Sequence, residues 1–169
     1  MLLILLLAAA GCSTSSVRTG TALVGQGPGL SGVIGNPNAK VGRDYRFAFP
    51  LLKNNSKEPV SITEFRITSL PSGVKVIGYP VYSVNHTSGY QLAYDDSSHE
   101  GGPELDKTPN YAGHPYTIKP GVLSDKYAMV HLHVTGKLSA HVKGCEVYYT
   151  QDGQSYRQSL KCEFALDMK

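Results

Sequence analysis

The chain has 169 residues, of which 41% are hydrophobic and 17% are charged. This composition suits one folded domain with flanking segments and is too apolar for an intrinsically disordered chain. The formal net charge is only +3, and the 16 Lys and Arg residues form no run of five or more. Nucleic-acid binding requires a concentrated basic surface, so we expect no nucleic-acid partner.

The first ten residues, Met1 to Ala10, carry no polar side chain. A helix needs about 20 apolar residues to cross a bilayer, so this run is too short to span one. It fits the apolar region of a secretory signal peptide, and small residues follow it in Ala9-Ala10-Gly11-Cys12. We therefore expect residues 1–11 to be a signal peptide that is removed on export.

These residues resemble the lipobox of bacterial lipoproteins. In that family the cysteine thiol receives a diacylglycerol, the leader is cut just before the cysteine, and the new N-terminus is often acylated. The resemblance implies that Cys12 carries acyl chains such as palmitate and that the membrane is a partner. It places the protein in the cell envelope, on the outer side of the cytoplasmic membrane or in the outer membrane. Because no basic residue precedes the apolar run, we expect the natural chain to start upstream of Met1.

A polar run at residues 13–16 follows, and Gly and Pro then recur at short intervals. Flexible spacers have this composition. The sequence therefore predicts a tether from Cys12 to Gly42, in which Val33 and Ile34 are apolar enough to form a short edge strand.

From residue 43 to residue 169 the sequence predicts short strands separated by turns. Tyr45, Phe47, Phe49 and Leu51 occupy alternate positions, as in a half-buried strand. The further strands are predicted at 60–67, at 74–84 with an interruption at Gly78 and Pro80, and at 90–94, 116–119, 127–135 and in a C-terminal hairpin.

Within residues 60–67 the inward positions change from Val60 and Ile62 to Phe65 and Ile67, which predicts a bulge. Seven to eight short strands with frequent turns indicate an all-β fold, an antiparallel immunoglobulin-like β-sandwich over 43–169. The stretch LLKNNSKEPVSI resembles the strand–turn–strand opening of many exported bacterial immunoglobulin-like domains. The chain has no Trp, which excludes the antibody type.

The other two cysteines, Cys145 and Cys162, flank a predicted hairpin turn. If Gly153 and Gln154 form the turn, Cys145 lies opposite Cys162 and both point inward. An exported protein can form this disulfide, and two buried thiols are the alternative. The residues sharing the inward face are Val147, Leu160 and Phe164.

The strand at 127–135 places two imidazoles on its outward face. His131 and His133 stand at positions i and i+2, where they can bind one metal ion. Met129 on the same face would suit copper, and His141 could approach across the following turn. A solvated strand face is the alternative interpretation.

The segment from Asp95 to Pro115 is long for a connection within one domain, and long loops often carry function. Its carboxylates could bind calcium, although their spacing is not that of an EF-hand, and a solvated loop is the alternative. The acidic residues are Asp95, Asp96, Glu100, Glu104 and Asp106.

Tyrosines flank this segment and could form a surface for a partner, or could pack the segment onto the sheet. They are Tyr90, Tyr94, Tyr111 and Tyr116.

The sequence has no G-x-S-x-G, H-E-x-x-H, P-loop or dinucleotide-binding motif. We therefore expect a non-enzymatic binding or interaction module without a cofactor, whose second partner is an unknown envelope protein or glycan. Two alternatives are a lipoprotein that binds copper or zinc through His131 and His133, and an envelope hydrolase of unrecognised type.

Overall fold

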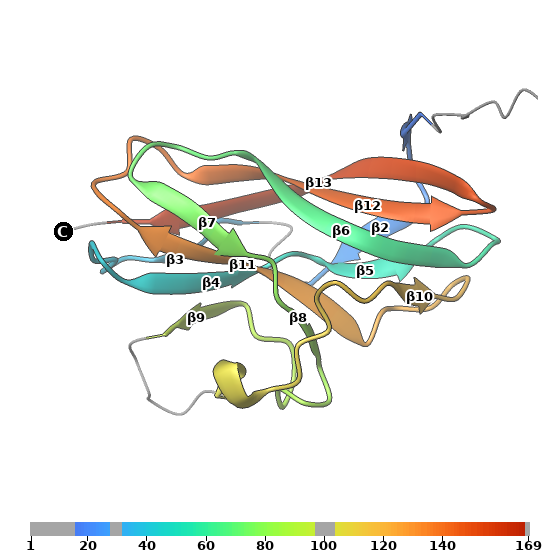
Figure 1. Ribbon diagram of the computed structural model, residues 1–169, viewed down its shortest axis with the longest axis horizontal. Coiled ribbons are helices and arrows are strands. Elements are labelled where there is room, and N and C mark those ends of the chain that lie inside the picture. The colour runs from blue at the N-terminus through green and yellow to red at the C-terminus, as the bar shows by residue number, and fades with distance from the viewer. Residues whose placement is uncertain (1–15, 28–31, 97–103, 168–169) are drawn as a thin grey trace, which may run out of the picture.

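The computed structural model describes residues 16–27, 32–96 and 104–167, and strands dominate it (Figure 1). A single 3₁₀ turn, η2 (Leu105–Lys107), accompanies the strands in these ranges. The strands are β1 (Arg18–Thr19), β2 (Leu23–Gln26), β3 (Ile34–Asn36), β4 (Asp44–Ala48), β5 (Leu51–Asn54), β6 (Val60–Ser69), β7 (Val74–Gly78), β8 (Val81–Ser83), β9 (Ala93–Asp95), β10 (Tyr116–Ile118), β11 (Lys126–Val134), β12 (Val142–Gln151) and β13 (Gln154–Leu166).

Two larger sheets form a β-sandwich. One has the order β1-β13-β12-β6-β10, with β3 also paired to β13, and the other has the order β7-β11-β4-β9, with β8 also paired to β11. A third, two-stranded sheet joins β2 to β5. The orders β6-β12-β13 and β7-β11-β4 are those of strands C-F-G and D-E-B in immunoglobulin domains, so the predicted fold class is confirmed.

The core lies between the two sheets and follows the alternation of the strands. Val130 and Leu132 of β11 point into it with 0% exposure, as the period of two predicts. The ring of Phe47 from β4 stacks on Phe164 from β13, with centroids 5.3 Å apart. This aromatic contact joins the two sheets through the core.

The residues before 43 differ from the predicted flexible tether. β1 and β3 pair in parallel with β13, and β2 pairs antiparallel with β5. Leu23 and Ala39 are buried, so the folded domain begins before residue 43. The strand that the sequence suggested around Val33 and Ile34 corresponds to β3.

Glycine in this segment serves close packing where the sequence pattern suggested flexibility. A Cβ atom on Gly20 would stand 2.0 Å from the hydroxyl oxygen of Tyr149, so a larger residue cannot occupy the position without movement of that ring. The same hydroxyl accepts a hydrogen bond from the backbone N–H of Ala22.

Two irregularities of the predicted strands are confirmed. The pairing of β12 with β6 shifts between Tyr148 and Tyr149, where the buried positions of β6 change from Ile62 to Phe65. The stretch 74–84 is divided into β7 and β8, because Pro80 has no N–H to donate to a ladder.

The C-terminal hairpin has its turn one residue earlier than predicted. Gln151 pairs with Gln154, so Asp152 and Gly153 form the turn, with φ values of 49° and 72°. Two positive φ angles define a type I′ turn, which asparagine, aspartate and glycine tolerate best. The correct partner of Cys145 in the ladder is therefore Leu160.

The disulfide between Cys145 and Cys162 is nevertheless present, with Cα atoms 5.8 Å apart. The register error is two residues, which leaves every side chain on its predicted face. A bulge between Lys143 and Cys145, at Gly144 with φ 71°, brings Cys162 to Cys145. Both cysteines are buried.

Residues 84–96 and 104–115 are here called the covering segment: β9 pairs with β4 at the edge of the sheet, and the rest lies on the outer face of the β4–β11 sheet, away from β12 and β13 (Figure 1). A small second core forms beneath the segment. Its buried members are Ala48, Tyr82, Leu105, Tyr127 and Met129. The segment is therefore packed against the sheet and does not project from it as a loop.

Candidate functional site

Polar side chains gather on the outer face of β4 and β11, beside the second core. The two strands are antiparallel, and their ladder pairs His131 with Arg46 and His133 with Asp44. The inward faces of both strands are apolar, so alternation directs these four side chains to the same outer surface. The edge of the covering segment adds further charges to this group.

Asp44 contacts both imidazoles. Its Oδ2 lies 3.1 Å from Nε2 of His131, and its Oδ1 lies 2.5 Å from Nδ1 of His133. Burial raises the pKa of Asp44, but hydrogen bonds from His133 and His131 outweigh this, and the net pKa is lowered. Asp44 is therefore a carboxylate around which the two histidines are arranged.

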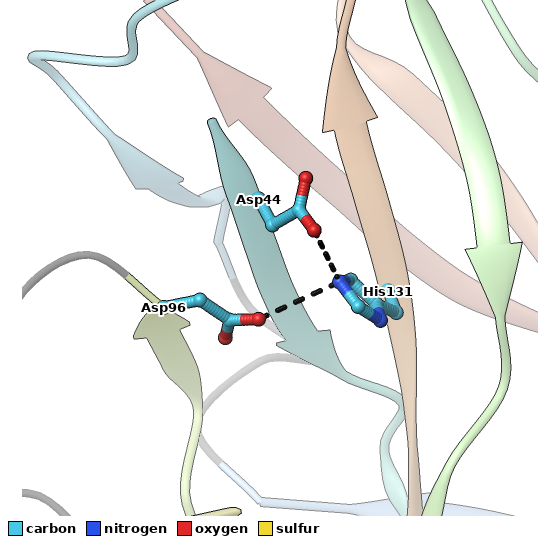
Figure 2. A group of neighbouring side chains, drawn as sticks. All are labelled: Asp44, Asp96 and His131. Carbon is cyan, nitrogen blue, oxygen red and sulfur yellow. Dashed lines mark hydrogen bonds and ion pairs between the residues drawn. The ribbon is translucent and has the colours of Figure 1, made fainter. Parts of the chain in front are cut away.

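Asp96 approaches the same imidazole from the covering segment, directly after β9. Its Oδ2 lies 3.5 Å from Nε2 of His131, and Figure 2 shows Asp44 of β4 and Asp96, just after β9, converging on this nitrogen. Burial raises the pKa of Asp96, although Arg46 and His131 oppose that shift. Its other oxygen, Oδ1, is buried without a hydrogen-bond partner in the described residues.

Arg46 links the sheet to the covering segment from a buried position, with a side-chain exposure of 6%. Its Nη2 donates to Asp96 at 2.8 Å and to Asp106 at 2.6 Å, and its Nη1 donates to the hydroxyl of Tyr82 at 3.1 Å. Burial lowers the pKa of Arg46, but the bond to Asp106 and the surrounding negative charge raise it overall. This guanidinium is a permanent positive charge held between the two layers.

Asp44, Asp96 and His131 each offer one ligand atom, and these atoms lie within 4.8 Å of one another. His131 is thus placed where the sequence suggested a metal ligand. His133 is adjacent but bonds to Asp44 and lies outside this three-residue group. The arrangement can hold a proton shared among hydrogen bonds, or a cation.

The other two suggested ligands lie elsewhere. Met129 is buried in the second core with 0% exposure. Nδ1 of His141 donates to Oε1 of Glu163 at 2.7 Å, and its Nε2 lies 3.9 Å from Asp167. Neither residue belongs to the group around His131.

Sequence reasoning missed Asp44, and it considered Asp96 only for calcium. The pairing of β4 with β11 would have identified Asp44, because it stands opposite His133 in the ladder. Of the other suggested calcium ligands, Asp106 binds Arg46, Glu104 pairs with Lys107, and Glu100 lies outside the described residues.

The four tyrosines have different environments. Tyr90 donates to the backbone carbonyl of Phe49, and Tyr94 packs against the second core, so both hold the covering segment to the sheet. Tyr111 stacks with the His86 ring at a centroid distance of 6.1 Å. Lys126 lies over the rings of Tyr111 and Tyr116, at 5.3 Å and 5.8 Å.

A cavity of about 430 Å³ opens between β7 and the covering segment, next to His131 and Arg46. Leu105 and Asn110 from the segment and Ile77 from β7 contribute to its walls. A second cavity, of about 220 Å³, lies beside it and is lined by Phe65, Tyr79, Tyr111 and Tyr116 among others. The volume of the larger cavity lies in the range that is common for ligand pockets.

Cys12, the predicted lipidation site, lies outside the described residues. In the ranges that the structure covers, no helix has the length and apolar character needed to span a bilayer.

No protein-family profile and no curated protein matches the chain. Among solved structures, the chain is similar to the VesB protease of Vibrio cholerae, with a TM-score of 0.37 and 14% identity. The match covers 80% of this chain and 30% of the protease, so the chain spans less than a third of that protein. A similarity of this degree indicates neither the fold nor the activity of this chain.

Proposed function

We propose that this chain is a non-enzymatic binding module of the bacterial cell envelope, held at the membrane by lipid on Cys12. The observation that carries the proposal is the cavity of about 430 Å³ beside His131 and Arg46. Its lining mixes apolar side chains such as Ile77 and Leu105 with charged groups such as Arg46, so a ligand can make both kinds of contact there. The covering segment that forms it is an addition to the sandwich on the outer face of one sheet.

The anchor and the sandwich are close together in the chain. Only residues 13–17 separate Cys12 from the start of β1 at Arg18. Fully extended, that stretch spans about 20 Å, so a lipid on Cys12 would keep the domain near the membrane surface. Two or three acyl chains attach a protein stably to a membrane. Confinement at a surface raises the effective concentration at which the module meets its partner, so weak binding suffices.

The partner of this module is an envelope protein or a glycan on the outer side of the cytoplasmic membrane or in the outer membrane. Tyr111, with the His86 ring stacked on it and Lys126 above it, supports such a role. Aromatic rings next to polar groups bind both sugars and protein surfaces. Tyr90 and Tyr94 contribute by fixing the covering segment.

The anchor is tested by membrane fractionation of the Cys12→Ser chain, with Ser13→Ala as the matched control. We expect Cys12→Ser to leave the membrane fraction and Ser13→Ala to remain in it. If the Cys12→Ser chain stays with the membranes, the lipid anchor is excluded.

The binding surface is tested by placing a photo-reactive phenylalanine analogue at Ile77, which lines the cavity and is 50% exposed. Val24, 43% exposed on β2, is the matched control position. Illumination of intact cells should produce a discrete higher-mass adduct, protein or glycan, from position 77 only. Absence of an adduct at 77, or equal adducts at both positions, would contradict the proposal.

A further inference from the structure

The Nε2 atom of His131 lies between two carboxylates, 3.1 Å from Asp44 and 3.5 Å from Asp96 (Figure 2). A ring nitrogen carries at most one proton, and the neutral tautomer without that proton presents a lone pair to both anions. The arrangement is therefore stable only when a positive species, a proton or a metal ion, occupies the space between the three groups.

The charges around this nitrogen are unequal. Three carboxylates, Asp44, Asp96 and Asp106, contact the group, and Arg46 supplies one positive charge. With neutral imidazoles, three negative charges and one positive charge leave a net charge of about −2. A divalent cation would balance this charge, whereas an anionic ligand would increase it.

Asp96 provides an independent observation. Its Oδ1 is buried and accepts no hydrogen bond from the described residues, although Arg46 and His131 lie near Oδ2. Leaving a buried carboxylate oxygen without a partner costs free energy, so natural structures usually provide one. The oxygen that faces His131 is Oδ2, so a cation between the three groups would supply the missing partner of Oδ1 by binding both oxygens of the carboxylate.

We propose that a divalent metal ion of the zinc class binds between Asp44, Asp96 and His131. The inference rests on the proposed function, because it names a ligand for the same face of the binding module. It also revises the ligand set expected from the sequence: His131 stays, and the carboxylates of Asp44 and Asp96 replace His133, Met129 and His141.

The donor set favours zinc over the other metals considered. One imidazole and two carboxylates suit Zn²⁺, which takes nitrogen and oxygen ligands and usually three protein side chains when water completes the coordination. Calcium prefers oxygen ligands throughout, and Cu(I) prefers thioether or thiolate sulfur. The thioether of Met129 is enclosed in the second core and cannot serve.

The neighbours of the three ligands fit the same role. His133 bonds the free oxygen of Asp44 and fixes the orientation of that carboxylate. Asp44 and His131 belong to the sheet, whereas Asp96 belongs to the covering segment. A bound ion would therefore connect the segment to the sheet and stabilise the wall of the larger cavity.

The test is a calorimetric titration of the full chain, freed of metal with a chelator, using zinc chloride as the probe. We expect one equivalent to bind, and we expect His131→Ala and Asp96→Asn to weaken binding by at least about 100-fold. His141→Ala, which removes a half-buried histidine paired with Glu163, is the matched control and should bind as the parent does. Replacement of zinc by cobalt adds a visible absorption band that reports direct coordination.

Circular dichroism of each metal-free variant establishes that it is folded. No binding by the folded parent, or equal binding by folded His131→Ala, would overturn the metal site and leave only hydrogen bonding between His131 and the two carboxylates. The result is separable from the proposed function. Cys12→Ser should lose its membrane attachment and still bind zinc, so failure of one experiment does not imply failure of the other.

Discussion

Arg46 and Asp96 form an ion pair of 2.8 Å between β4 and the covering segment, and their side chains retain only 6% and 19% exposure. Removing one member of a buried pair leaves the other charge without compensation, which costs about 3–5 kcal/mol. We expect Arg46→Met to lower the free energy of unfolding by about 3 kcal/mol, measured by urea denaturation.

Asp106→Asn is the control for that experiment. Its side chain is 82% exposed although it also contacts Arg46, so its contribution should be at most about 1 kcal/mol. Equal losses for Arg46→Met and Asp106→Asn would show that the segment is not held by the buried pair.

The disulfide closes a loop with a sequence separation of 17. A loop of this size restricts the unfolded chain by about 3 kcal/mol. The Cys145→Ala, Cys162→Ala double variant should unfold at a correspondingly lower urea concentration and keep the same far-ultraviolet circular dichroism. Mass spectrometry of the unreduced parent that found two free thiols would refute the pairing itself.

Asn54 is buried with 0% exposure and connects two turns. Its amide nitrogen donates to the carbonyls of Glu58 and Ile118, and its oxygen accepts from the backbone and hydroxyl of Ser56. Each buried group left unpaired costs about 1–3 kcal/mol, so Asn54→Ala should destabilise the protein by about 3 kcal/mol in urea unfolding.

Asn55→Ala is the matched control for Asn54→Ala, because the side chain of Asn55 is exposed. It should change stability by no more than about 0.5 kcal/mol. If the two variants unfold at the same urea concentration, the hydrogen bonds of the Asn54 amide do not stabilise the protein.

The carboxylate of Glu163 bonds His141 and Lys143, at 2.7 Å and 3.0 Å, and these contacts lower its pKa below the ordinary 4.5. A lowered pKa in the folded state adds stability above the unfolded pKa, and that stability is lost as the pH falls through the folded pKa. Glu163→Gln should therefore show a smaller fall in melting temperature between about pH 6 and about pH 3 than the parent.

His141→Ala should reproduce part of that change, because the hydrogen bond from His141 is the largest cause of the lowered pKa. If the melting temperatures of the parent and both variants fall equally as the pH is lowered, the contacts of Glu163 are not the source of this pH dependence.

The sequence predicted the sandwich and the cysteine pairing because both depend on the alternation of side chains. Phe47 and Val130 were placed inward by a period of two, and the parity of Cys145 and Cys162 survived a turn that was displaced by one residue. Parity is preserved by any register error of two residues, so both cysteines were placed on the correct face although their partners were not. The alternation was wrong at Leu51, which packs against the second core while Leu52 enters the main core, because the stretch is divided into β4 and β5.

The candidate site was predicted only in part because it is built by contacts between distant elements. His131 and His133 were visible as neighbours on one strand, but Asp44 reaches them through strand pairing and Asp96 through the packing of the covering segment. No local pattern in the sequence specifies either contact. The glycines before residue 43 suggested a flexible tether for a similar reason. A glycine is needed at position 20 because the ring of Tyr149, far away in the sequence, packs against it.

The outer edge of β13 is covered by the N-terminal part of the domain. β1 pairs with Tyr156 and Arg157, and β3 pairs with β13 from Phe164 to Leu166. Between them the side-chain amide of Gln158 bonds both the N–H and the carbonyl of Leu23, as a neighbouring strand would.

Uncovered strand edges recruit strands from other molecules and cause aggregation. Proteolysis after β3 would free this edge while leaving the main sheets connected, and the shortened protein would be prone to edge-to-edge association. The glycine-rich N-terminal stretch therefore protects this edge from pairing with the sheet of a neighbouring copy.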